Sequence, residues 1–211
     1  MSIRLLFFIM WAFISLGMYM GIVTLPQDAQ LGDSFRILFF HLPAAILAFS
    51  SFTLTAVTGI MYLRTNEIRW DMISAGAVRL GFIFGALALA TGWAFSYLAW
   101  GTKWSWDPKV VATLVMWFVY SGYLMLRRSV DEESRRARLC AVYGIVGYVS
   151  VPLSYLSSRL VYSLHPEGIG LTLLMKTTAV VMTIGFFLLY FYLLWFDMKL
   201  GMLSRHREAK L

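Results

Sequence analysis

Cysteine, charge and histidine are all scarce in this chain of 211 residues, and each scarcity excludes a class of protein. The one cysteine, Cys140, leaves no partner for an internal disulfide, a redox motif or a covalent haem attachment site, each of which needs two cysteines. Charged residues make up 14% of the chain, whereas a soluble domain carries about 25%. The three histidines show no HxxxH or HExxH spacing, so the common zinc-site patterns are also missing.

Apolar residues make up 60% of the chain and are gathered into long runs. A membrane-spanning helix needs about 20 mostly apolar residues, and six runs approach that length. They are Leu5–Val23, Ile37–Leu63, Leu80–Trp100, Val110–Leu126, Leu139–Leu156 and Leu171–Phe196. Their length and lack of alternation exclude the strands of a β-barrel. The sequence therefore predicts an all-α integral membrane protein, a single domain of six transmembrane helices over residues 1–211, whose first helix is retained rather than cleaved as a signal peptide.

The 18 lysines and arginines are divided unevenly between the two sides that six spans define. Five fall on one side, namely Arg36, Lys103, Lys109, Arg159 and Lys176, and the other 13 fall on the side that holds both termini. Cytoplasmic segments carry the excess of basic residues, so both termini are predicted to be cytoplasmic. The net charge of +7 is thus a signal of topology, and nucleic acid is not an expected partner.

Three of the eight tryptophans lie within the nine residues of Trp100-Gly-Thr-Lys-Trp104-Ser-Trp106-Asp107-Pro108. The predicted topology places this loop, at about residues 100–109, on the outer face together with His41 and His165, whereas His206 falls in the basic cytoplasmic tail. Each residue taken alone has an ordinary interpretation, since interfacial tryptophans commonly form an aromatic belt. Their occurrence on one face favours a ligand site.

Haem is the ligand that these residue types suit best. Two histidines on separate elements can fill the two axial positions of a haem iron, and tryptophan offers a broad apolar surface to the porphyrin. The two propionates need cations, for which Arg36 and Lys109 are the candidates. The sequence therefore predicts non-covalent binding of haem b at the outer face.

The stretch Trp100-Gly101-Thr102-Lys103-Trp104-Ser105-Trp106-Asp107 matches the WGxxWxWD signature of haem-handling proteins in cytochrome c biogenesis. With its six predicted helices and outer histidines, the chain resembles the CcmC family over nearly its whole length. The resemblance implies axial ligation by His41 and His165, and an arginine of the family pattern is matched by Arg36. It also implies that the porphyrin is held and presented by Trp100, Trp104, Trp106 and Asp107. Where the family commonly has an arginine after the Trp-Asp pair, this chain has Lys109, which keeps the charge but not the bidentate fork.

The same resemblance implies a function in haem delivery rather than enzymatic turnover. A protein of this kind in the bacterial inner membrane would hold haem at the periplasmic face and present it to the haem chaperone CcmE. It would work beside CcmD and the ABC-type subunits CcmA and CcmB. The sequence has no GxxxxGK[ST] motif, so any ATP hydrolysis is expected to belong to a partner.

Three other interpretations remain open from the sequence. A b-type cytochrome subunit for electron transfer would need further histidines at mid-membrane depth. A transporter with an aromatic gate would need polar or charged residues within its spans, which are nearly free of them. The larger haem exporters with the same tryptophan motif carry extra spans and a second histidine pair, for which this chain is too short and too poor in histidine.

Overall fold

The computed structural model describes residues 3–101, 106–163, 165 and 170–208, and these form helices joined by short connections. The long helices are α1 (Ile3–Tyr19), α2 (Leu38–Thr65), α3 (Ile68–Trp100), α4 (Pro108–Ser129), α5 (Glu133–Gly147), α6 (Ser150–Leu160) and α7 (Leu173–Glu208). A π-helical turn, η1 (Met20–Thr24), extends α1, and a 3-10 turn, η2 (Ser34–Ile37), leads into α2.

Six helical segments of the described chain are long and apolar enough to cross a membrane, which confirms the predicted fold class. They are Ile3–Thr24, Ser34–Thr65, Ile68–Trp100, Pro108–Ser129, Glu133–Leu160 and Leu173–Arg205. The largest differences from the predicted spans are in two helices: α3 begins at Ile68 rather than Leu80, and α7 continues past Phe196. The charged residues at these two helix ends favour a loop when the sequence is considered alone. In the structure, ion pairs between helices allow both ends to remain helical.

The fifth span consists of two helices rather than one. A turn at Tyr148 and Val149 separates α5 from α6, and Pro152 lies in the first turn of α6. A proline is tolerated there because the first backbone N–H groups of a helix have no intrahelical acceptor. Hydropathy alone registers the apolar length of Leu139–Leu156 and not its division into two helices.

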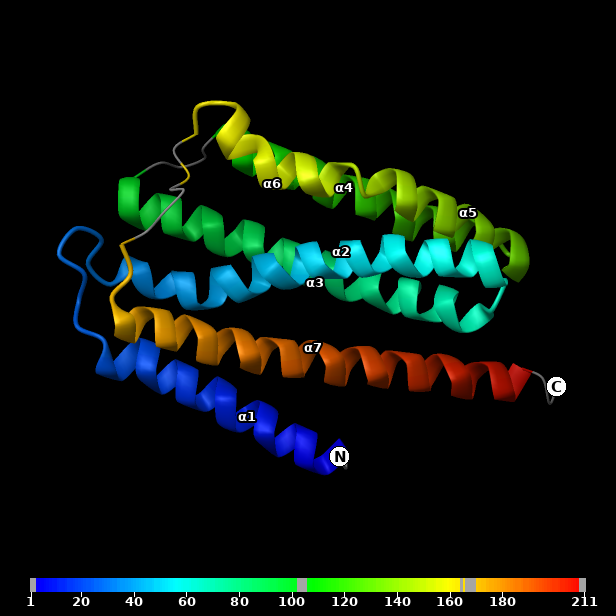
Figure 1. The fold of residues 1–211 in the computed structure, drawn as a ribbon, viewed down its shortest axis with the longest axis horizontal. Helices are drawn as coiled ribbons and strands as arrows, with labels where there is room; N and C mark the ends of the chain where they lie inside the picture. The colour runs from blue at the N-terminus through cyan, green and yellow to red at the C-terminus, as the bar shows by residue number, and fades with distance from the viewer. Residues whose placement is uncertain (1–2, 102–105, 164, 166–169, 209–211) are drawn as a thin grey trace.

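The helices α2 and α3 occupy the middle of the bundle (Figure 1). On one side lie α1 and α7, and on the other lie α4, α5 and α6. The described connecting residues 25–33, 106–107 and 161–163 gather at one end, called here the tryptophan end. The opposite end, called here the arginine end, carries the connections at 66–67 and 130–132 and the last turns of α7.

Small residues let α2 and α3 approach each other closely. A Cβ atom added to Gly81 of α3 would lie 2.7 Å from the Cβ of Ser51 and 2.7 Å from a ring carbon of Phe52, both on α2. Close approach through small side chains is a common way to pack helices in lipid, where burying apolar surface provides little driving force. On its other side Phe52 stacks on Tyr120 of α4, with ring centroids 3.6 Å apart. The two central helices are thus fixed to each other and to α4.

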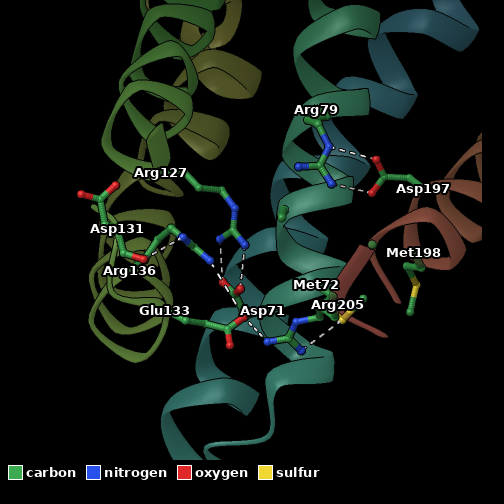
Figure 2. Close-up of a pocket in the computed structure, with 12 residues that line it drawn as sticks. Asp71, Met72, Arg79, Arg127, Asp131, Glu133, Arg136, Asp197, Met198 and Arg205 are labelled. Atoms are coloured by element: carbon green, nitrogen blue, oxygen red, sulfur yellow. Dashed lines mark hydrogen bonds and ion pairs between the residues drawn. The ribbon is translucent and has the colours of Figure 1, made fainter. Parts of the chain in front are cut away.

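Ion pairs tie four helices together at the arginine end, around a pocket of about 660 Å³ (Figure 2). Arg127 of α4 donates two hydrogen bonds of 2.7 Å to Asp71 of α3, whose side chain is only 4% exposed. Arg79 of α3 makes a similar two-bond contact with Asp197 of α7 at the more exposed edge. A third pair joins Arg205 of α7 to Glu133 of α5. The pairs satisfy charges at the ends of the spans.

We predict that the buried pair contributes far more to stability than the exposed one. Asp71→Ala leaves the Arg127 guanidinium buried without its partner, which costs about 3–5 kcal/mol in comparable proteins, whereas exposed pairs contribute about 0–1 kcal/mol. Thermal unfolding of the purified protein in detergent should therefore show a large fall in Tm for Asp71→Ala and a small one for Asp197→Ala. The double variant Asp71→Leu/Arg127→Met should recover much of the loss, because no unpaired charge remains. Equal falls for the two single variants would contradict the prediction.

Candidate ligand site at the tryptophan end

A cavity of about 590 Å³ opens at the tryptophan end, between α2, α3, α4 and α6. Its size is within the range of about 300–1,000 Å³ that is typical of small-molecule sites. Its walls are mostly apolar, and five of the residues singled out in the sequence line it: His41, Trp100, Asp107, Lys109 and His165. The tertiary structure thus brings together both outer histidines and part of the tryptophan motif.

The ring of His41 is held in one tautomer by α3. Its Nδ1 lies 3.1 Å from the carbonyl oxygen of Ala88 and 3.1 Å from the hydroxyl oxygen of Thr91. A carbonyl can only accept, and the Thr91 hydroxyl already donates to Leu87 at 2.7 Å, so Nδ1 carries the proton. The lone pair is therefore on Nε2. Metal-binding histidines are usually arranged in this way, with one ring nitrogen bonded to a carbonyl and the other free for the metal.

A glycine gives this ring its space. A Cβ atom at Gly92 would lie 3.1 Å from Cε1 of His41, which is closer than most Cβ atoms come to a neighbour. Thr91 and Gly92 therefore define the position of His41 although neither was expected from the sequence. Their signal in the sequence was weak, since a Thr-Gly pair within an apolar helix is ordinary.

Asp107 has a structural function that the motif alone does not reveal. It is the N-cap of α4 and accepts a 2.8 Å hydrogen bond from the backbone N–H of Lys109. The hydroxyl of Ser163 lies 2.8 Å from each of its carboxylate oxygens. The Ser163 oxygen in turn accepts a 3.1 Å hydrogen bond from the backbone N–H of His165. Asp107 thus connects α4 to the segment that carries the second histidine.

The two candidate cations differ in their relation to the cavity. Lys109 lines it, and its ammonium donates to the carbonyl oxygens of Ser154 and Tyr155 at 2.9 and 3.1 Å. Arg36 is not among the lining residues; its guanidinium donates to the carbonyl oxygens of Gly21 and Leu25 and to Asp33. The hydrogen bond from Arg36 holds the pKa of Asp33 below its ordinary value. Of the two residues, only Lys109 lies where it can face a ligand in the cavity as described.

The tryptophans also differ in whether they line the cavity. Trp100, at the end of α3, lines the cavity, and so does Trp93 seven residues earlier, which the sequence analysis missed. A spacing of seven places two residues on one face of a helix, and that spacing was the available signal. Trp106 is 79% exposed and is not among the lining residues. Trp104 lies outside the described residues.

The metal chemistry open to this site is limited. Within residues 3–101, 106–163, 165 and 170–208, no group of three or more histidine, cysteine, aspartate or glutamate side chains could hold a metal ion. A bare cation would need such a group, whereas a metal already held in an organic ring needs only one or two protein ligands.

Comparison with known proteins shows the family of this chain. The family model described as "CcmC: Heme exporter protein C" matches residues 1–211. The chain belongs to the CcmC family. The Heme exporter protein C of Escherichia coli K12 is 30% identical over 152 residues, which cover 72% of this chain and 62% of that protein. The protein of the same name from Bradyrhizobium diazoefficiens is 30% identical over 140 residues, covering 66% of this chain and 53% of that protein.

A more distant relative comes from a plant. A ccmC-like mitochondrial protein of Marchantia polymorpha, named for cytochrome c biosynthesis, is 24% identical over 161 residues, covering 76% of this chain and 68% of that protein. The matches to the two bacterial CcmC-family proteins therefore span between about half and two thirds of their length.

Removal of the Asp107 carboxylate should weaken the tryptophan end of this CcmC-family chain. Asp107→Ala loses the N-cap of α4, worth about 1 kcal/mol, as well as the contact with Ser163. Asn is as good an N-cap as Asp, so Asp107→Asn should retain more of the stability. The Tm in detergent should thus fall in the order wild type, Asp107→Asn, Asp107→Ala. A Tm for Asp107→Ala that equals the wild-type value would show that the cap is not needed.

Proposed function

We propose that this protein binds haem non-covalently in the cavity at the tryptophan end, with His41 and His165 as axial ligands, and delivers it for cytochrome c maturation. The observation that carries the proposal is the joint presence of both histidines and Trp100 on one apolar cavity. The tautomer of His41 supports it, because Nε2 is left with the lone pair that iron requires. Membership of the CcmC family supports the identity of the ligand.

The residues around the cavity suit the chemistry of haem. Trp93, Trp100 and Phe49 supply aromatic surface for a flat porphyrin, and Lys109 is the cation placed to meet a propionate. Arg36 would serve as a second propionate partner only by exchanging some of its present bonds. Trp104, Trp106 and Asp107 complete the motif that we propose holds and presents the ring.

The distribution of charge supports an orientation for the bundle. The arginine end carries most of the basic residues, and cytoplasmic segments are enriched in them. We therefore propose that both termini are cytoplasmic and that the haem site faces the periplasm from the bacterial inner membrane. A site on that face would be open to the chaperone CcmE.

We further propose that the protein is a delivery platform and not an enzyme. CcmE would take the haem, CcmD would accompany this subunit, and CcmA with CcmB would supply any ATP hydrolysis. The cytochrome alternative is disfavoured because His206, the one histidine left after His41 and His165, follows the sixth apolar run of the sequence, in a basic segment. Two histidines at one end of a bundle provide no second haem position for electron transfer across the membrane.

Substitution of the axial ligands tests haem binding. His41→Ala and His165→Ala should each weaken haem retention strongly without unfolding the protein, and the double variant should retain almost none. Gly92→Ala should also lower retention, because its new methyl group meets the His41 ring. Gly170→Ala is a matched control, since a Cβ atom there meets no described atom within 4 Å. The measurement is the Soret absorbance per protein after purification; an unchanged spectrum in the double variant would refute the ligand assignment.

Two tryptophans should separate haem binding from haem delivery. Trp100→Ala removes a wall of the cavity and should lower haem retention. Trp106→Ala changes an exposed side chain outside the lining and should leave haem bound while slowing its transfer to CcmE. Covalent haem on CcmE, measured per haem-loaded subunit, distinguishes the two effects. Normal transfer by Trp106→Ala would show that Trp106 is not part of the surface that presents haem to CcmE.

A further inference from the structure

The two proposed ligands are held in very different ways. His41 lies on α2, and its ring is partly buried and bonded through Nδ1 to Ala88 and Thr91 of α3. Any movement of this ring must break those bonds or shift two packed helices. His165 lies between α6 and α7, outside both helices, and its side chain is exposed. Segments of that kind open at a much lower free energy than packed helices do.

A short chain of hydrogen bonds connects His165 to the body of the protein. The buried carboxylate of Asp107 accepts from the Ser163 hydroxyl, and the Ser163 oxygen accepts from the backbone N–H of His165. The first of these bonds is made to a charged group, and such bonds are about twice as strong as neutral ones. Asp107 is itself fixed as the N-cap of α4. The serine hydroxyl thus connects the backbone of His165 to the start of α4.

We propose that Ser163, held by Asp107, is the positioning residue for His165, and that His165 is the ligand that detaches first when haem is delivered. This inference rests on the haem site proposed above. In the step, the coordinate bond between His165 and iron breaks and its electron pair stays on the imidazole. The iron keeps its oxidation state and its bond to His41. Ser163 is not among the residues that line the cavity, although it bonds to Asp107 and His165, which are. It therefore acts through His165.

Such an arrangement fits the direction of delivery. Loss of His165 opens the coordination position on the side of the exposed connection, where a partner can approach, while His41 retains the haem from within the bundle. Loss of His41 first would instead require its bonds to Ala88 and Thr91 to break, or α2 and α3 to shift, before any partner had bound. The hydroxyl of Ser163 then determines how readily the iron coordination position occupied by His165 becomes vacant.

The test uses carbon monoxide as a probe of that position. Carbon monoxide binds ferrous haem only when an axial position is vacant, so its rate of binding to the haem-loaded protein in detergent reports how often His165 is detached. Ser163→Ala should retain haem but bind carbon monoxide faster than wild type by about ten-fold or more, as expected for the loss of a hydrogen bond to a charged group. Ser163→Thr keeps the hydroxyl and should return the rate toward that of wild type.

Ser157→Ala is the matched control. Its hydroxyl donates to the carbonyl oxygen of Ser154, in the same region but without contact to Asp107, so its rate should equal that of wild type. If Ser163→Ala proves unstable, Asp107→Asn tests the same connection, because it keeps the cap but loses the charge that strengthens the bond to Ser163. Asp107→Asn should also raise the rate of carbon monoxide binding, but by less than Ser163→Ala does.

The outcomes separate this inference from the haem site itself. A wild-type rate in haem-loaded Ser163→Ala, alongside a fast rate in His165→Ala, would overturn the positioning function of Ser163 and leave the site intact. Loss of all haem from Ser163→Ala, as in His41→Ala, would overturn the order of detachment. A wild-type spectrum and rate in His165→Ala would instead refute the ligand assignment on which the inference rests.

Discussion

The close packing of α2 against α3 is the contact on which the rest of the molecule depends. It needs small residues such as Gly81 where the helices approach, because a single added Cβ would collide with Ser51 and Phe52. The same interface continues toward the tryptophan end, where Thr91 and Gly92 of α3 receive the ring of His41. Helix packing and ligand geometry are thus two parts of one interface.

Lipid imposes a second constraint, which explains why polar chemistry is concentrated at the two ends. Charged groups are costly within the hydrocarbon region, so each end must satisfy its own charges. At the arginine end Asp71, Arg127, Arg79 and Asp197 do so by pairing across helices (Figure 2). At the tryptophan end the carboxylate of Asp107 is satisfied by a helix cap and a serine, and the aromatic cavity lies beside it.

This division changes how the tryptophan motif is understood. The resemblance to the CcmC family implies that Asp107, together with its neighbouring tryptophans, belongs to a surface that holds the porphyrin. The structure adds a different function, in which the aspartate joins the start of α4 to the segment bearing His165. A single side chain then couples the motif to His165. Asp107 thus has a positioning function as well as a place in the lining of the cavity.

The amino-acid sequence by itself determined the number of spans, the uneven charge of the two ends and the residue types at the site. These follow from hydropathy and from local charge, which depend little on packing. The polar ends of α3 and α7, the division of the fifth span into α5 and α6, and the contributions of Trp93, Thr91 and Ser163 were decided by tertiary structure. Ion pairs and hydrogen bonds between distant segments create those features, and no local pattern records which segments will meet.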